Sequence, residues 1–88
     1  TDPAMTPTET AIHEFLVTDL LYDKDLAGLR AEDDLLERGL LDSLGILRVV
    51  TFCEERFGIT IPDTEVLPDH MSSVRAIAAL VERVRAKG

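Results

Sequence analysis

The chain has 88 residues, which is the length of a single small domain. Hydrophobic residues make up 45% of it and aromatic residues only 5%, a composition typical of an aliphatic helical core and not of a disordered chain. The net charge of -8 excludes a protein that coats nucleic acid and favours a basic protein surface as the partner. No apolar run approaches the roughly 20 residues that span a bilayer, so we expect no membrane partner.

A single cysteine, Cys53, excludes an internal disulfide framework and a cysteine-rich zinc site, so we expect no metal centre. It fits the reducing cytoplasm, where we expect the protein. The four residues before Met5 resemble a cloning remnant, and we expect no signal peptide. We therefore divide the chain into residues 1–5, the remnant with its start methionine, and residues 6–88, a single domain.

The first expected element is a helix over about residues 7–21. Thr6, Pro7 and Glu9 fit the N-cap, N1 and N3 positions of a capping box. Apolar residues then recur at helical spacing at Ile12, Phe15, Leu16 and Leu20. We expect Leu20 in the core and His13 in solvent.

Residues 22–41 mix acidic residues with leucines and break the helical pattern. This predicts a long connection anchored by its leucines, with room for one helical turn, and such long loops are often functional. The neighbouring Glu32, Asp33 and Asp34 predict mutual repulsion that acid or salt would relieve. The segment resembles a calcium-binding loop only faintly, so a solvated acidic loop is favoured.

A second helix is expected from Asp42-Ser43 to Phe57, with Gly58 as its left-handed C-cap. Helical spacing predicts a core face formed by Ile46, Val49, Val50, Cys53 and Phe57. The opposite face, formed by Leu44, Arg48, Thr51 and Glu55, is expected to be exposed.

The C-terminal third predicts a short third helix and a longer last one. Residues 59–62 are expected to be extended because Pro62 disfavours helix before it, and residues 64–71 to hold at most a short helix interrupted by Pro68. His70 is expected at the surface. Ser72 or Ser73 caps the last helix, whose apolar stripe is Val74, Ile77, Ala78, Val81 and Val84. The fold class is therefore all-α: a right-handed, mostly antiparallel four-helix bundle with a short third helix and a long first loop.

Ser43 is the strongest candidate for a functional residue. It lies in the first turn of an amphipathic helix, where free backbone N–H groups and the positive end of the helix dipole favour a bound or attached phosphate. The structural alternative is that Asp42 or Ser43 merely caps the helix.

Two segments resemble the acyl carrier protein family. One is Leu40-Leu41-Asp42-Ser43-Leu44, and the other is Phe57-Gly58-Ile59 followed by Ile61-Pro62-Asp63. The Asp-Ser-Leu motif alone is weak evidence, but the second segment at the right distance makes it strong. The resemblance covers roughly residues 8–85.

This resemblance implies that a phosphopantetheinyl transferase joins 4′-phosphopantetheine, derived from coenzyme A, to the oxygen of Ser43, with Asp42 as its motif neighbour. The thiol of the arm then holds an acyl or aminoacyl group as a thioester. An activating ligase loads this group and a downstream synthase or transferase accepts it. The domain itself is expected to be a monomer without enzymatic activity.

The expected partner-binding residues lie on the outward face of the second helix: Leu44, Leu47, Arg48 and Thr51. Fatty-acid carriers have an acidic residue directly after the Asp-Ser-Leu motif, whereas this chain has Gly45. The departure favours a specialised stand-alone carrier of the polyketide, aminoacyl, peptidyl or D-alanyl type. The peptidyl type usually has a Gly-Gly-(Asp/His)-Ser motif, which this chain lacks.

Two further classes of function compete with this interpretation. The first is a helical interaction module without a cofactor, in which Ser43 is only a cap. The second is a small serine hydrolase, for which His13 and His70 are the available bases. The hydrolase is disfavoured because nothing in the sequence aligns either histidine with Ser43.

Overall fold

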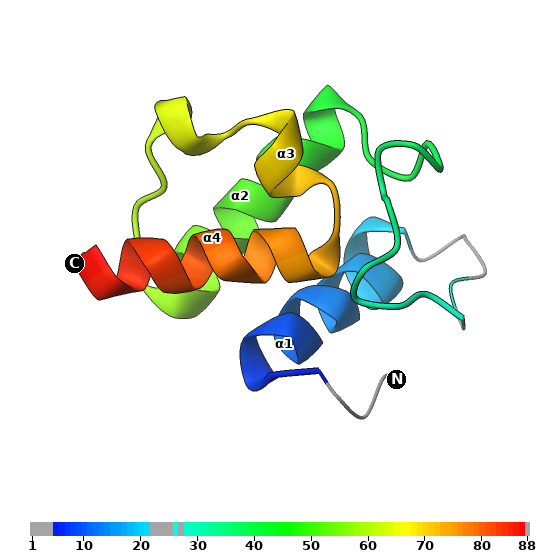
Figure 1. The fold of residues 1–88 in the computed structure, drawn as a ribbon, viewed down its shortest axis with the longest axis horizontal. Helices are drawn as coiled ribbons and strands as arrows, with labels where there is room; N and C mark the ends of the chain where they lie inside the picture. The colour runs from blue at the N-terminus through cyan, green and yellow to red at the C-terminus, as the bar shows by residue number, and fades with distance from the viewer. Residues whose placement is uncertain (1–4, 22–25, 27, 88) are drawn as a thin grey trace.

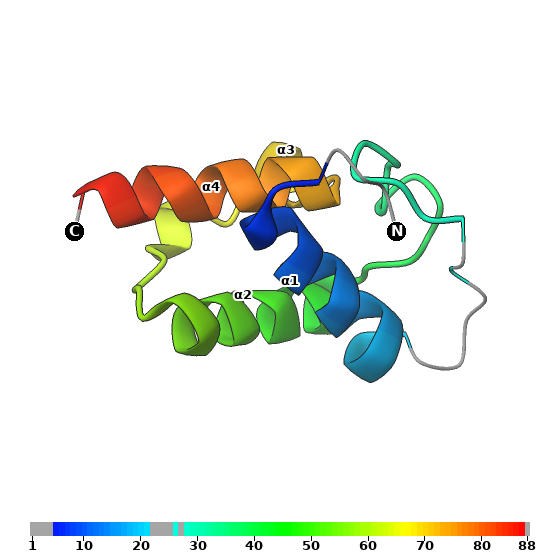
Figure 2. The same ribbon diagram turned by 90° about the horizontal axis from the view of Figure 1, so that it is seen from below.

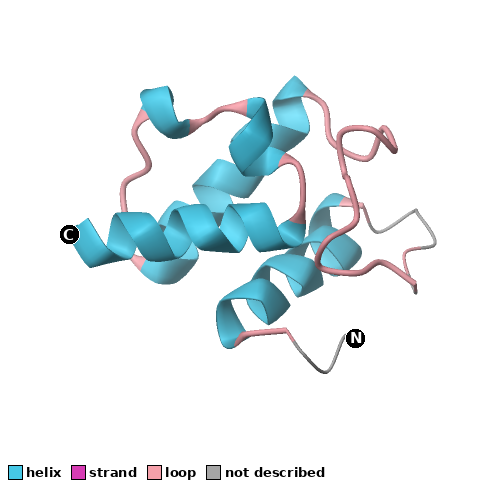
Figure 3. Ribbon diagram, viewed as in Figure 1, coloured by secondary structure: helices cyan, strands magenta, loops and turns pink. Residues whose placement is uncertain are grey.

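The computed structural model describes residues 5–21, 26 and 28–87, and within them every regular element is a helix (Figures 1 and 3). The elements in chain order are α1 (Pro7–Phe15), the π-helical turn η1 (Leu16–Leu20), α2 (Ser43–Phe57), the 3₁₀ turn η2 (Asp63–Glu65), α3 (Pro68–Met71) and α4 (Val74–Lys87). The predicted all-α fold with a short third helix and a long first loop is confirmed. None of these helices is both long enough and apolar enough to cross a bilayer.

Helix α1 begins with the predicted capping box. The Thr6 hydroxyl accepts a hydrogen bond from the Glu9 backbone N–H at 3.1 Å, and a Glu9 carboxylate oxygen accepts one from the Thr6 N–H at 2.9 Å. Both contacts satisfy amide groups that would otherwise lack partners at the helix start. The local sequence alone therefore fixes where this helix begins.

The expectation that Leu20 belongs to the core is wrong, because α1 continues into a π-helical turn. The backbone N–H of Leu21 donates to the Leu16 carbonyl at 2.7 Å, five residues back. This wider turn brings the side chain at i+5, not i+4, onto the buried face. Leu21 is accordingly 8% exposed beneath the fully buried Leu16, whereas Leu20 lies half-buried at the edge.

Helix α2 has the predicted bounds, and Gly58 adopts the left-handed conformation at its end with φ of 66°. Its predicted core face is only partly buried. Val49 and Cys53 are fully enclosed, while Phe57 and its neighbours on that face pack at the margin of the core. Phe57 was expected in the core, but the bundle opens near the end of α2 and leaves its ring half-covered.

An aromatic contact joins α1 to α2. The rings of Phe15 and Phe52 stack with their centroids 4.3 Å apart. Offset or stacked aromatic pairs add specific geometry to apolar burial. The helical spacing of apolar residues in α2 did not predict that Phe52 is part of the core face. Its ring lies at the side of α2 that contacts α1.

Pro68 begins a helix and does not interrupt one, so that expectation is corrected. It occupies the first helical position of α3, where a missing N–H costs nothing. The extended segment before η2 is as predicted, and Ser73 is the cap of α4, since its hydroxyl accepts from the Ala76 N–H at 3.0 Å. Leu80 is also fully buried, because both α1 and α3 pack on α4 and widen its buried face.

The main helices enclose one core. In Figure 2, α1 runs against α2 and α4, and α2 and α4 end on the same side of the molecule. The side-chain hydroxyl of Thr8 on α1 donates to the Glu82 carboxylate on α4. The largest fully buried side chains are Ile12, Leu16, Leu35, Val49, Cys53, Met71, Val74, Ile77, Leu80 and Val81.

The connection between η1 and α2 is anchored by its leucines, as expected. Among its described residues, the buried apolar ones are Leu21, Leu26, Leu29, Ala31, Leu35 and Leu41. Two backbone hydrogen bonds fasten it to the start of α4: Leu35 N–H donates to the Ser72 carbonyl at 2.6 Å, and Arg75 N–H to the Ala31 carbonyl at 2.9 Å. Over residues 26 and 28–41 the chain forms turns and no helix, while residues 22–25 and 27, which include part of the faint calcium-loop pattern, lie outside the described residues.

His13 is buried, contrary to the expectation that it faces solvent. It is 8% exposed, and its Nε2 atom lies 3.2 Å from the Leu29 carbonyl oxygen. The helical pattern of α1 leaves His13 at the edge of the apolar stripe. The loop then folds across that edge and covers it, which no pattern within α1 could indicate.

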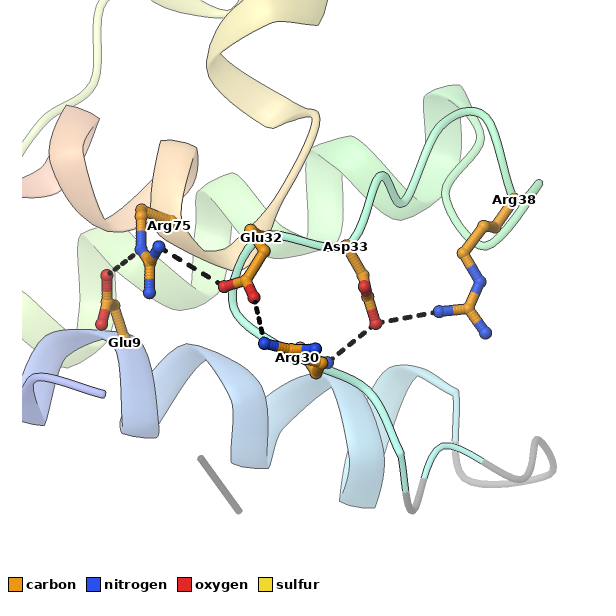
Figure 4. Close-up of polar contacts among 6 residues, drawn as sticks. All are labelled: Glu9, Arg30, Glu32, Asp33, Arg38 and Arg75. Atoms are coloured by element: carbon orange, nitrogen blue, oxygen red, sulfur yellow. Dashed lines mark hydrogen bonds and ion pairs between the residues drawn. The ribbon is translucent and has the colours of Figure 1, made fainter. Parts of the chain in front are cut away.

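Two loop carboxylates, those of Glu32 and Asp33, have cationic partners, which corrects the picture of a mutually repelling cluster. Figure 4 shows Glu32 between Arg30, at 3.0 Å, and Arg75, at 3.4 Å. Arg75 also reaches Glu9 on α1 at 3.4 Å. One guanidinium group therefore links α1, the loop and α4.

The next two carboxylates are engaged within the loop. Asp33 accepts from the Arg38 guanidinium at 3.1 Å and from the Arg30 backbone N–H at 2.9 Å (Figure 4). Asp34 accepts from the two backbone amides that lie two and three residues after it. Protonating these groups would therefore weaken native contacts as well as relieve repulsion.

We expect Leu35, which lies in the loop and outside the helices, to contribute strongly to the stability of the fold. Replacement of the fully buried Leu35 by alanine should lower the free energy of unfolding by about 2–5 kcal/mol, because it leaves a cavity beneath the loop. Chemical denaturation monitored by circular dichroism measures this change. The matched control is Leu47→Ala on exposed α2 surface, which should cost less than about 0.5 kcal/mol. Equal effects for the two variants would contradict the anchoring of the loop.

Candidate functional site

Ser43 is the first residue of α2, and its side chain is exposed. The preceding Asp42 performs the capping: its Oδ1 atom accepts a hydrogen bond from the Gly45 N–H at 2.7 Å. Asp42, and not Ser43, is therefore the N-cap of α2. The Ser43 hydroxyl stays at the positive end of the helix dipole without a capping duty.

The loop before α2 turns this serine outward. Gly39 has a φ of 72°, a conformation that side-chain-bearing residues rarely adopt. The Leu40 N–H donates back to the Leu35 carbonyl at 2.8 Å, which closes the turn on its buried anchor. Leu41 then points into the core, whereas Asp42 and Ser43 emerge at the surface.

Gly45 lets the cap sit close to the helix. A Cβ atom at this position would lie 3.3 Å from both Asp42 Oδ1 and Leu41 Cδ2. With a larger residue here, both the capping carboxylate and the buried leucine would have to shift slightly. Gly45, which stands where fatty-acid carriers have an acidic residue, thus has a local structural reason. It preserves the tight Asp42 cap directly beside Ser43.

A hollow of about 330 Å³ lies beside the serine. It is formed where η1, the end of the loop and the start of α2 meet, and is lined by Leu20, Leu21, Gly39, Leu40, Asp42, Leu44, Gly45 and Arg48. Most of these residues are apolar, and Asp42 and Arg48 give the hollow one charge of each sign.

The outward face of α2 is exposed as predicted. Leu44 and Leu47 are 69% and 60% exposed, and Arg48 and Thr51 are also in solvent. Large exposed leucines side by side are typical of a protein-binding surface.

This surface continues onto α1. A second hollow, of about 380 Å³, is lined by Phe15, Asp19, Leu47, Arg48, Thr51, Phe52 and Glu55. The Arg48 guanidinium lies 6.0 Å from the centre of the Phe15 ring and borders both hollows. The aromatic floor of this surface was not predicted, because it forms only where α1 pairs with α2.

The other residues considered for chemistry are engaged elsewhere. His13 contacts the Leu29 carbonyl, and His70 Nδ1 lies 2.6 Å from the Glu65 carbonyl while its Nε2 lies 3.4 Å from Arg83. Neither histidine hydrogen-bonds to Ser43 within the residues that the structure describes. The same residues contain no cluster of three or more metal-ligating side chains.

The all-helical domain and the exposed serine at the start of α2 agree with a carrier of the acyl-carrier class. The family model described as "Phosphopantetheine attachment site" matches residues 16–81, and the chain belongs to that family. It is therefore a carrier protein that holds its cargo on a covalently attached 4′-phosphopantetheine group.

Individual relatives agree with this assignment. D-alanyl carrier proteins of Streptococcus pyogenes serotypes M5 and M49 are each 32% identical to the chain over 81 residues, which is 92% of this chain and 98% of each relative. A solved structure described as "Structure of KstB-PCP(apo)" has 37% identity and a TM-score of 0.71, covering 86% of this chain and 84% of its own.

The residues at the start of α2 fit such a group. An exposed hydroxyl at the N-terminus of a helix suits a phosphodiester, because the dipole and first-turn N–H groups favour its negative charge. The hollow beside it is bordered by Asp42 and Leu44, the two residues that flank this hydroxyl in the chain. When attached, the group supplies a thiol that holds cargo as a thioester, and this chain positions and presents it.

Cys53 is a core residue, as predicted, and burial raises the pKa of its thiol to about 12, with the nearby Glu54 charge adding to the rise. Because the folded protein favours the protonated thiol, the resulting stabilisation is present below the unfolded pKa near 9 and is lost as the pH rises toward 12. The wild type should therefore lose stability over this range more steeply than Cys53→Ala.

Urea denaturation at a series of alkaline pH values measures the difference between the two proteins. The groups that titrate in both proteins cancel in this comparison. Parallel stability curves for wild type and Cys53→Ala would contradict a thiol held protonated by the core.

Proposed function

We propose that the Ser43 Oγ atom is the attachment point of the arm. This assignment rests on the structure at the start of α2. Asp42 caps the helix, and Ser43 is exposed at its first turn. A transferase must reach a serine hydroxyl with its phosphate donor, so an exposed serine at a helix N-terminus is the accessible and electrostatically suited one. Ser72 and Ser73 are half-buried, and Ser73 is used as a cap.

The proposed cargo is an aminoacyl group activated by an ATP-dependent ligase in the cytoplasm. The names of the relatives support this, since D-alanyl carrier proteins match nearly their whole length. The charge of α2 also supports it. Residues 42–57 hold Asp42, Glu54 and Glu55 against Arg48 and Arg56, so this helix lacks the strong acidity of fatty-acid carriers.

Partner enzymes would dock on the outward face of α2 formed by Leu44, Leu47, Arg48 and Thr51. The phosphopantetheinyl transferase, the ligase and a downstream transferase must all approach Ser43, and this face begins one residue away. Leu44 provides an apolar anchor, and Arg48 discriminates against partners with basic docking sites. The chemistry resides in these partners, and the carrier contributes position and recognition.

Ser43→Ala should abolish transfer of phosphopantetheine while leaving the helical circular dichroism unchanged, since Asp42 still caps α2. Intact mass spectrometry after incubation with coenzyme A and a broad-specificity transferase provides the readout. Ser72→Ala is the matched control and should be modified like the wild type. Modification of the Ser43→Ala protein would refute the assignment of the attachment atom.

Leu44→Ala and Arg48→Glu should each lower kcat/KM for aminoacyl loading, Leu44→Ala by at least about tenfold, because a leucine buried at an interface contributes about 1.5–3 kcal/mol. Loading is measured on the phosphopantetheine-bearing protein with ATP, an amino-acid mixture and an extract of the source organism. The Ser43 peptide is then identified by mass.

Arg56→Glu is the matched control for charge, since it lies on the same helix near the opposite end. It should load like the wild type. An unchanged kcat/KM for Arg48→Glu would remove this residue from partner selection. Loading that requires acyl-coenzyme A and not ATP with amino acids would overturn the aminoacyl cargo.

A further inference from the structure

A pocket of about 580 Å³ lies at the opposite end of α2 from Ser43. It forms where α2 and α4 end on the same side of the molecule (Figure 2). Its lining is Phe57, Gly58, Ile59, Thr60, Pro62, Glu65, Arg83, Val84, Arg85 and Lys87. This volume lies within the usual range for a binding site, and no step of the carrier function uses it.

The charge of the pocket is opposite to that of the protein. Three cations and one carboxylate line it, which gives +2 against a net charge of -8 for the whole chain. Arg83 donates to the Glu65 carboxylate at 2.9 Å, and this hydrogen bond is the main reason that the Glu65 pKa is lowered. Arg85 pairs with Glu82 at 3.6 Å, but both side chains are exposed and such a pair contributes little, so an acidic ligand can compete for Arg85. Lys87 forms no ion pair with the residues that the structure describes.

The floor of the pocket is apolar and its cations are held beside it. Phe57, Ile59, Pro62 and Val84 provide the apolar surface. The Arg85 guanidinium lies 5.8 Å from the centre of the Phe57 ring, within the range of a cation–π contact. An apolar floor with cations at the rim fits a ligand that combines an aliphatic side chain with neighbouring carboxylates.

The location of the pocket favours a protein partner. Ser43 and Phe57 are the two ends of α2, so at about 1.5 Å per residue they lie about 21 Å apart along the helix axis. A partner segment held at Phe57 would leave the face around Ser43 free for an enzyme. Such a tether raises the local concentration of the carrier without competing for the arm.

We propose that this pocket docks an acidic peptide segment of a partner protein. The segment inserts an aliphatic side chain against Phe57, Ile59 and Val84 and places carboxylates near Arg85 and Lys87. Charge complementarity and the apolar floor together select this occupant, since neither a basic nor a wholly polar segment satisfies both. The site is independent of the attachment at Ser43.

The test uses a synthetic probe, the capped peptide Asp-Glu-Leu-Leu-Asp-Glu, titrated into isotopically labelled full-length protein. Backbone amide signals of Gly58, Thr60 and Val84 should shift in a saturable manner, and the affinity should fall as salt is added. Two control peptides, one with lysine for each acid and one with serine for each leucine, should leave these signals in place. The Ser43→Ala protein should bind the probe as the wild type does, which separates this result from the proposed attachment.

Charge reversal by Arg85→Glu with Lys87→Glu should weaken binding at least about tenfold. Because Arg85 also contacts Phe57, Lys87→Glu alone is the second variant, and circular dichroism checks that each remains folded. Arg48→Glu, on the docking face near Ser43, is the matched control and should bind normally.

Absence of shifts, shifts with the lysine peptide, or unchanged affinity in folded Lys87→Glu and double-variant proteins would overturn the proposal. Octanoate provides the remaining comparison. If it binds the same residues more tightly than the peptide, the pocket is a site for small amphipathic anions and the peptide assignment is wrong.

Discussion

The clamp between the long loop and the turn before α4 is the constraint on which the site depends. Leu35 is fully buried, and its N–H donates to the Ser72 carbonyl. From this anchor the chain turns at Gly39, buries Leu41 and emerges at Asp42, so the start of α2 has a fixed position relative to α3 and α4. The exposure of Ser43 is thus a consequence of packing some eight residues earlier in the chain.

Charge is distributed unevenly over the surface. In the acidic loop, Glu32 and Asp33 are paired with arginines from the loop and from α4, and these pairs help to fasten the domain together (Figure 4). The outward face of α2 carries leucines and Arg48, which suits selective apolar docking. Positive charge gathers at the far end of α2, where it lines a pocket remote from Ser43.

Local sequence signals predicted the structure correctly where the backbone groups of a helix end find their hydrogen-bond partners within the same segment. The capping box at Thr6, the bounds of α2 and the left-handed Gly58 all follow from backbone groups that need nearby partners. Expectations that required a second element were less secure. A π-helical turn buries Leu21 in place of Leu20. His13 is covered by a loop that comes later in the chain.

The sequence by itself determined the all-α class, the family resemblance and Ser43 as the candidate residue, because helix periodicity, caps and a short motif are written in neighbouring positions. Only the tertiary structure decided that Phe15 and Phe52 floor the hollow beside the outward face of α2, and that α2 and α4 end together around a basic pocket. Those features join residues far apart in the chain. Their contacts depend on how whole helices pack, which a pattern confined to one segment does not encode.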